Sequence, residues 1–395
     1  MRRASIGKSV RRKTDLAICG AAPAFTEPLH VGRPNIGDRE SFLRRVSEIF
    51  DDRWLTNNGA MVRQFERRLS EQLNVRNCVA MCNGTIALEI AIRALGLSGE
   101  VIVPSWTFIA TAHALYWQGI TPVFADVDPV THNLDPEAVR RAITPLTTGI
   151  IGVHLWGRPA SVDELQVVAN AHELKILFDA AHAFGTSLDG RVIGGFGDCE
   201  VLSFHATKVF NTFEGGAVVT NDDELADKMR LMRNFGFSGY DNVIHPGTNG
   251  KMAEINAAMG LVNLDALPGF VETNRRNHED YMRAFEGVEG VRILPHLPEH
   301  SPNYQYIVAE VDPEFMASRD EVVSALHAEN VLARKYFWPG CHRMKPYRDL
   351  YPHAGLLLPE TQKLAARVMV LPTGSSVGTD EIRVIGDVFR VLSRR

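Results

Sequence analysis

Residues 201–221 read VLSFHATKVFNTFEGGAVVTN and hold a single lysine, Lys208, between two short runs rich in β-forming residues. Both runs, residues 201–204 and 217–220, have the length and apolar character of buried strands, so Lys208 is predicted to lie in the polar loop that joins them. An amine in a partly desolvated pocket loses its proton more easily than one in water, as Schiff base formation with an aldehyde cofactor requires. A solvated loop lysine is the alternative from this stretch alone.

The loop at Lys208 belongs to a longer alternation of strands and helices. Short apolar runs at residues 101–103, 122–125, 149–154 and 175–179 are separated by helical or polar segments. This alternation predicts an α/β fold in three layers, with a mostly parallel sheet covered on both faces. Functional groups are expected at the carboxyl ends of the strands.

Two strand ends carry candidate functional residues. Asp179 closes an apolar run and is predicted either to cap a helix or to pair with a cation in a cleft. The predicted strand at residues 78–81 leads into Asn83, Gly84 and Thr85 and then into a helix. The free N–H groups and the dipole of a helix start favour a phosphate, and a glycine there lets the ligand approach the backbone, although any capped helix after a strand gives this pattern.

The alternation of strands and helices that marks the large domain ends near residue 268, after a predicted helix over residues 253–264. A second helix is predicted over residues 268–285, followed by short strands and helices. This segment has the size of a small α+β domain. We therefore predict a large domain at residues 26–267 and a small C-terminal domain at residues 268–395.

The first 25 residues carry two Arg-Arg pairs before a weakly apolar stretch. A twin-arginine export signal is disfavoured because Asp15 follows the arginines and the apolar run is only about nine residues long, at the low end for such signals. A disordered basic leader at residues 1–25 is the simpler prediction. No apolar run approaches the roughly 20 residues of a membrane helix.

Composition narrows the class of protein. The chain has 395 residues, 45% hydrophobic and 23% charged, with a net charge of -5, so it is not built to coat nucleic acid. Its cysteines form no CxxC pair, and their odd, scattered set is typical of reduced thiols in the cytoplasm. They are Cys19, Cys78, Cys82, Cys199 and Cys341.

Two other classes of site are disfavoured. The string nearest to a dinucleotide fingerprint, GGFGDCE, has Glu200 in place of the third glycine, which removes the main support for a nicotinamide enzyme. No HExxH motif and no clustered Cys/His spacing predicts a metal site.

Together, these blocks resemble the pyridoxal-phosphate enzymes of fold type I, and more narrowly the nucleotide-sugar aminotransferases of the DegT/DnrJ type. They follow the family's order from about residue 30 to residue 375. The blocks are WLTNNG, CNGTIALEIA, VPSWTFIATAHA, VHLWGRPA, FDAAHAFG, LSFHATK, EGGAVVTND, GTNGKMAEINAAMG and VLPTG.

The resemblance implies roles around the cofactor ring. Lys208 matches the lysine that forms the Schiff base and then moves the proton between substrate and cofactor carbons. Asp179 matches the carboxylate that keeps the pyridine nitrogen protonated, which makes the ring an electron sink. His182 stands where the family has a Gln or His beside the phenolic oxygen. Phe108, rather than Trp106, matches the aromatic that stacks on the ring. Without the resemblance, Phe108, Trp106 and His182 would each be interpreted as core residues.

The resemblance also implies how the cofactor phosphate is held. Gly84 and Thr85 match the helix start, and Ser203 matches a serine that hydrogen-bonds the phosphate. Asn249 matches an asparagine that reaches the phosphate from the neighbouring subunit. The active unit is therefore expected to be a homodimer with its sites at the subunit interface.

The implied reaction is transamination from glutamate, through the pyridoxamine form, to a nucleotide-linked 4-keto-6-deoxy sugar. His205 before Lys208, and the loop at residues 243–252, favour carbon 4 and a thymidine diphosphate 4-amino-4,6-dideoxyglucose product, as in deoxysugar and antibiotic biosynthesis. Arg334 and His342 lie where family members bring residues of the small domain close to the sugar nucleotide. Solvent-exposed surface residues are an equally good interpretation of both.

Four alternatives stay open at this stage. They are a 3-keto nucleotide-sugar aminotransferase, a pyridoxal enzyme for a small amino acid, a family dehydratase and a non-catalytic binding protein. Lys208 disfavours the dehydratases, which have a histidine in its place. The set of Lys208, Asp179 and Ser203 disfavours a protein that has lost catalysis.

Overall fold

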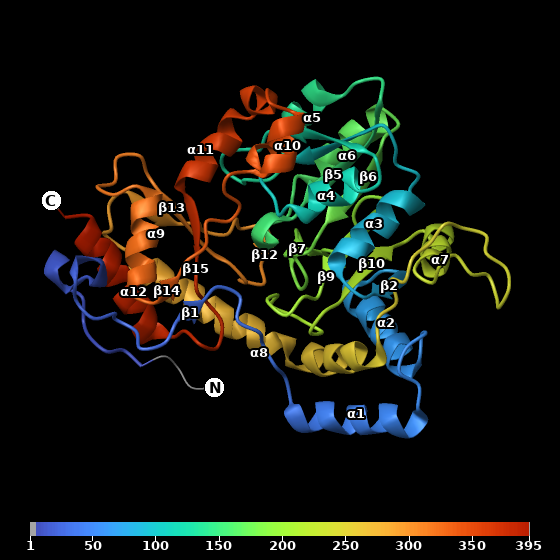
Figure 1. Ribbon diagram of the computed structural model, residues 1–395, viewed down its shortest axis with the longest axis horizontal. Coiled ribbons are helices and arrows are strands. Elements are labelled where there is room, and N and C mark those ends of the chain that lie inside the picture. Colours follow the sequence, from blue (N-terminus) through green and yellow to red (C-terminus); the bar gives the residue numbers. More distant parts are fainter. Residues whose placement is uncertain (1–4, 395) are drawn as a thin grey trace.

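The computed structural model describes residues 5–394, which form a large lobe around a central sheet and a smaller lobe beside it (Figure 1). The central sheet has seven strands in the order β2-β10-β9-β6-β5-β3-β4. All run in one direction except β10, which is antiparallel to both neighbours. Their bounds are β2 Asn77–Met81, β3 Glu100–Pro104, β4 Thr121–Ala125, β5 Thr147–Val153, β6 Lys175–Asp179, β9 Cys199–Ser203 and β10 Gly216–Thr220.

Helices cover both faces of this sheet. Successive strand residues point to opposite faces, so Val101 and Val103 pack beneath α3, α4 and α7, whereas Ile102 packs beneath α5 and α6. On the Ile102 side, the end of the sheet at β2, β10 and β9 is covered by α2 and α8. The predicted three-layer α/β fold is therefore confirmed. The helix bounds are α2 Ala60–Leu73, α3 Gly84–Ala94, α4 Ala110–Tyr116, α5 Pro136–Ala142, α6 Val162–Ala171, α7 Asp223–Met232 and α8 Glu254–Ala284.

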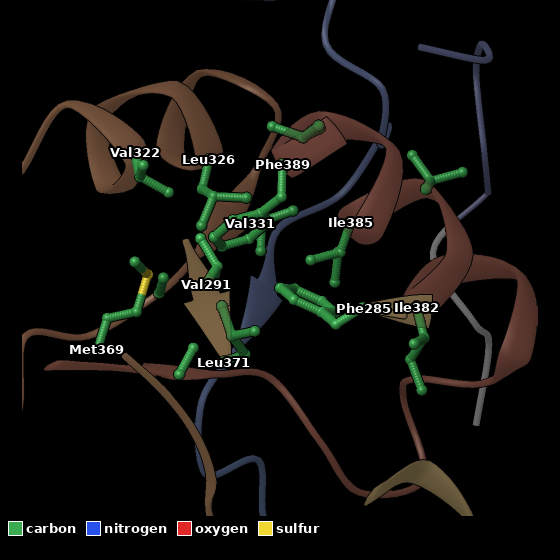
Figure 2. Close-up of a cluster of buried hydrophobic side chains, with 14 of the residues drawn as sticks. Phe285, Val291, Val322, Leu326, Val331, Met369, Leu371, Ile382, Ile385 and Phe389 are labelled. Carbon is green, nitrogen blue, oxygen red and sulfur yellow. The ribbon is translucent and has the colours of Figure 1, made fainter. Parts of the chain in front are cut away.

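The small lobe has its own core, as the predicted α+β unit requires. A three-stranded antiparallel sheet, β11-β13-β15, packs against α9 and α12. Figure 2 shows Phe285, Val291, Leu326 and Phe389 meeting in this core. The bounds are β11 Val291–Ile293, β13 Ile307–Val311, β15 Val368–Leu371, α9 Arg319–Ala328 and α12 Thr379–Leu392.

Residues 5–25, predicted to be a disordered leader, instead pack on the small lobe. Leu16 is 2% exposed and Phe25 is fully buried, and both belong to the hydrophobic core of the small lobe. The buried carboxylate of Glu329 accepts hydrogen bonds from the backbone N–H groups of Ala17 and Ala24, both at 2.6 Å. The prediction of disorder is wrong here because apolar residues spaced along this basic segment pack against the small lobe, which is distant in the sequence. Residues 1–4 lie outside the described residues.

The two helices predicted at residues 253–264 and 268–285 are one continuous helix, α8, which runs from the large lobe to the small one (Figure 1). Pro268 lies inside it. Proline removes one backbone donor and normally ends or bends a helix. Buried residues before and after it, such as Leu264 and Tyr281, hold the helix in both cores. The expected domain boundary at residues 267/268 thus falls within an element that both lobes share.

The remaining elements are short connections or peripheral helices. β1 pairs in parallel with β14, and β12, β7 and β8 form a small antiparallel sheet. Among residues 5–394, no helix combines the length and the apolar character needed to cross a membrane. The bounds are α1 Arg39–Asp52, α10 Lys345–Leu350, α11 Pro359–Arg367, β1 Leu29–His30, β7 Ser187–Leu188, β8 Arg191–Val192, β12 His300–Ser301 and β14 Val331–Leu332.

Candidate active site

Lys208 lies in the predicted position, in the loop between β9 and β10. Its backbone N–H donates to the carbonyl oxygen of His205 at 2.9 Å, and its side chain is half-buried. Burial lowers the pKa of Lys208 to about 8, and the negative charge of Asp179 partly opposes this shift. The amine therefore gives up its proton far more readily than a surface lysine.

Asp179 ends β6, which pairs with β9, so its carboxylate lies at the same edge of the sheet as the Lys208 loop. The side chain is 5% exposed. Thr111 Oγ1 donates to Oδ2 at 2.9 Å, and the Ala181 N–H donates to Oδ1 at 3.1 Å. Burial raises the pKa of Asp179, whereas these two bonds and the charge of Lys208 lower it. Since no ion pair to Asp179 occurs within residues 5–394, a protonated ring nitrogen fits this carboxylate.

His182 follows Asp179 on the turn after β6 and is buried. Its Nδ1 accepts a hydrogen bond from the Trp156 N–H at 3.2 Å, so in the neutral ring the proton lies on Nε2. Burial, reinforced by the charge of Lys208, holds the pKa of His182 well below its usual value. The ring stacks on Phe337 with centroids 5.8 Å apart and meets Tyr306 edge-on at 4.9 Å. His182 is therefore a neutral donor in a fixed orientation.

The start of α3 forms a cradle for an anion. Asn83 caps the helix by accepting from the Ile86 N–H at 2.9 Å, which leaves the N–H groups of Gly84 and Thr85 without an acceptor in the described part of the chain. A Cβ at Gly84 would lie 3.0 Å from Ser203 Cβ, so glycine allows the serine of β9 to reach the helix start. Two free N–H groups, a hydroxyl and the helix dipole suit a phosphate.

Phe108 and Trp106, the two aromatic candidates, lie in different environments. Trp106 is fully buried and contacts Phe337 edge-on, as a core residue does. Phe108 is 53% exposed and lines a cavity of about 360 Å³ together with Arg334 and Tyr336. The Arg334 guanidinium lies 4.8 Å from the centre of the Tyr336 ring. Of the two aromatics, Phe108 is thus the one that a ligand can reach.

The other predicted site residues differ in how exposed they are. His205 is exposed, with its Nε2 3.4 Å from Glu214. Asn249 is exposed on the long loop after α7, so its predicted contact with a second subunit stays a prediction. His342 is 3% exposed, and its Nδ1 lies 2.7 Å from Ser105 Oγ. The predicted contact of His342 with the sugar nucleotide stays a prediction.

Four residues of the site were not singled out from the sequence. Thr111 holds Asp179, while Trp156, Tyr306 and Phe337 position His182. Thr111 stands within the motif VPSWTFIATAHA and Trp156 within VHLWGRPA, and these motifs were the available signals. The contacts of Tyr306 and Phe337 join the small lobe to the large one, and no local pattern predicts them.

The chain matches the DegT/DnrJ/EryC1/StrS aminotransferase family over residues 37–390. It is 37% identical over 368 residues to a dTDP-4-amino-4,6-dideoxy-D-glucose transaminase of Shigella dysenteriae, covering 93% of this chain and 99% of that protein. An Escherichia coli protein of the same name is 36% identical over 343 residues, covering 87% and 92%.

Solved structures give the same result. The crystal structure of DesI in the presence of its TDP-sugar product has a TM-score of 0.92 and 50% identity, covering 96% of each chain. PseC of Helicobacter pylori, an aminotransferase involved in pseudaminic acid biosynthesis, has a TM-score of 0.86 and 27% identity, covering 93% of this chain and 99% of that one. The resemblance inferred from the motifs is confirmed: with a fold type I architecture and a family match over nearly its whole length, the chain belongs to the DegT/DnrJ/EryC1/StrS family of pyridoxal-phosphate-dependent sugar aminotransferases.

Proposed function

We propose that this enzyme transfers an amino group from glutamate to carbon 4 of a thymidine diphosphate-linked 4-keto-6-deoxyglucose, using pyridoxal phosphate. The observation that carries the proposal is that Lys208, whose pKa is lowered to about 8, and the buried carboxylate of Asp179 lie at the same edge of the sheet. The substrate follows the printed names of the Shigella and Escherichia coli relatives and the TDP-sugar product of DesI.

The residues of this chain fit the cofactor. Pyridoxal phosphate, when bound, supplies an electron sink for the carbon that carries the nitrogen. Asp179 would hold the ring nitrogen in its protonated form, and His182 would donate from Nε2 to a ring oxygen. Gly84, Thr85 and Ser203 would hold the phosphate.

Lys208 has the chemistry of a proton carrier. With a pKa of about 8, about a tenth of its amine is neutral at pH 7, against less than about one in a thousand for a lysine in water. The neutral amine can accept a proton from a substrate carbon and return it at a neighbouring atom. Burial beside Asp179 and His182 limits exchange of that proton with water.

The proposed active unit is a homodimer in the cytoplasm. The long loop after α7 extends from the body of the large lobe (Figure 1) and exposes Phe235, Tyr240 and Ile244 together with Asn249. Apolar side chains exposed around a candidate phosphate ligand support a subunit contact there. Sedimentation analysis of the purified protein tests whether it is a dimer. Asn249→Ala is expected to leave the dimer intact and to weaken cofactor binding.

A panel of sugar nucleotides tests the substrate. The enzyme is first converted to its pyridoxamine form with glutamate and then mixed with 3-keto and 4-keto sugar nucleotides, and the amino sugar formed is identified. We expect turnover with the 4-keto-6-deoxyglucose substrate. Turnover with a 3-keto sugar alone would support the alternative 3-aminotransferase, and cofactor binding without turnover on any donor would support a binding protein.

A further inference from the structure

A buried arginine joins three segments near the start of α3. Arg233 directly follows α7 and is 6% exposed. Its guanidinium forms an ion pair with Glu66 of α2 and donates to the carbonyl oxygen of Ala80 in β2 at 2.7 Å. It also donates to Asn58 Oδ1, in the loop before α2, at 3.3 Å. One side chain therefore holds residues that lie 153 to 175 positions away from it in the sequence.

This group completes the edge of the central sheet. β2 is the edge strand of the seven-stranded sheet, next to β10. At Ala80 the N–H donates to Glu66 Oε1 at 2.8 Å and the carbonyl oxygen accepts from Arg233, so the ion pair takes the place of a neighbouring strand. The Glu66 side chain is only 15% exposed. A hydrogen-bonded ion pair this well buried keeps its partners in one arrangement, because displacing either group would leave the other charge uncompensated.

The main chain of Arg233 continues these contacts beyond Ala80. The carbonyl oxygen of Arg233 accepts from the Gly250 N–H at 2.9 Å, and the Gly250 carbonyl oxygen accepts from the Cys82 N–H at 2.8 Å. Lys251 pairs with Met81 in an isolated antiparallel bridge. The loop at residue 250 is therefore fixed along residues 81–82, directly before the cap of α3.

The loop at Gly250 also lies directly against α3. A Cβ at Gly250 would lie 3.0 Å from side-chain atoms of both Ile86 and Ile90, so the loop backbone packs closely on the first turns of this helix. The side chain of Arg233 thus fixes the strand that leads into α3, and its main chain fixes the loop that packs on α3. Together they set the position of the N–H groups at the start of the helix.

We propose that Arg233 is a positioning residue for the cofactor phosphate. It is not itself part of the phosphate cradle but fixes the strand and the loop that place the N–H groups of Gly84 and Thr85. Asn234, the next residue, pairs with Asn249 in an isolated antiparallel bridge. The same arginine therefore also anchors the residue proposed to reach the phosphate of a second subunit. This inference rests on the phosphate cradle of the proposed function and adds a residue that acts on the cradle through β2 and the loop.

The positioning role requires an arginine rather than any cation. A planar guanidinium carries five N–H donors, and that of Arg233 bonds a carboxylate, a carbonyl oxygen and an amide oxygen at once. The ammonium group of a lysine is a compact point charge, so it can keep the ion pair with Glu66 but not all three contacts. Arg233→Lys should therefore fold and hold the strand end less firmly, whereas Arg233→Gln loses the charge as well as these contacts.

The test compares the binding of pyridoxal phosphate with that of pyridoxal, which lacks the phosphate, to the full-length enzyme freed of cofactor. Equilibrium dialysis gives the two dissociation constants, and their ratio measures the contribution of the phosphate. In Arg233→Gln, we expect this preference for the phosphorylated form to fall at least about tenfold, with the affinity for pyridoxal changed less than about twofold. Arg233→Lys provides a second variant in case Arg233→Gln does not fold, and its preference should fall at least about threefold.

Arg230→Gln is the matched control. Arg230 lies one turn earlier, in α7, and donates to Asn77 Oδ1 at 2.9 Å, at the opposite end of β2, so this variant should keep the wild-type preference. The proposal is overturned if Arg233→Gln keeps that preference, if it loses affinity for both forms by the same factor, as a purely structural residue would, or if Arg230→Gln shows the same loss. A wild type that binds both forms equally well would instead overturn the phosphate cradle of the proposed function, and this inference with it.

Discussion

Thr111→Val is expected to raise the pKa of Asp179 and to move the acid limb of the pH–activity profile upward. Thr111 Oγ1 is the side chain that donates to Asp179, at 2.9 Å, and the other donor is the Ala181 N–H. Burial already raises the pKa of this carboxyl group. Valine keeps the shape of threonine but removes the donor, so the ionised form loses stability relative to the protonated form.

The size of the effect follows from the type of hydrogen bond. A hydrogen bond to a charged group contributes about 1.5–3 kcal/mol. Since one pKa unit corresponds to about 1.4 kcal/mol, the acid limb should move up by about one to two units. Activity should then fall about ten- to a hundredfold at a pH below the new limb and recover above it.

The assay is the rate of the glutamate half-reaction from pH 5 to pH 9, with cofactor loading measured in parallel. Thr107→Val is the matched control, because Thr107 Oγ1 lies 3.2 Å from Thr111 Oγ1 and is equally buried. It should move the limb by less than about half a unit. A folded, fully loaded Thr111→Val enzyme with the wild-type limb would show that this hydrogen bond does not hold Asp179 in its ionised form.

Three further perturbations test other parts of the structure. In the cofactor-free protein, the pKa of Lys208 is about 8 against 10.5 for a lysine in water. The unfolded chain therefore binds more protons than the folded protein between these two pH values. The free energy of unfolding should rise with pH across this range by up to about 3 kcal/mol. Lys208→Met should lack this rise when both proteins are unfolded with urea. Gly84→Ala places a Cβ 3.0 Å from Ser203 Cβ, so it should weaken pyridoxal phosphate binding about tenfold by equilibrium dialysis, and unchanged affinity would contradict the phosphate cradle. Leu16→Ala should lower the free energy of unfolding by about 2–4 kcal/mol in the same denaturation assay. Ile18→Ala is the control, because Ile18 is 54% exposed and its loss should not destabilise the protein. Equal free energies of unfolding for the two variants would mean that residues 5–25 do not pack in solution.

Local sequence patterns predicted much of the large lobe. The apolar runs at β6, β9 and β10 place Asp179 at a strand end and Lys208 in the loop between β9 and β10, as the structure has them. The Asn-Gly-Thr helix start likewise lies where predicted, beside Ser203. These features follow from interactions between residues close in the chain, so hydrophobic periodicity, capping and turn residues are sufficient signals.

Other features depend on contacts between distant segments. Thr111 meets Asp179 across 68 residues, and Glu329 holds Ala24 across 305. Nothing in the neighbouring sequence of Leu16 and Phe25 shows that they are buried, because their packing surface is the small-lobe core. Pro268 would normally end a helix, and only packing on both sides of it stabilises α8 as one continuous helix.

What the sequence by itself determined is the layered α/β fold, the place of Lys208 in the loop between β9 and β10, and the family. The tertiary structure alone decided that the N-terminal segment is packed, that α8 joins both lobes and that Thr111 meets Asp179. The physical reason is that burial and long-range hydrogen bonding depend on which surfaces meet, and a residue's neighbours in the chain do not specify this.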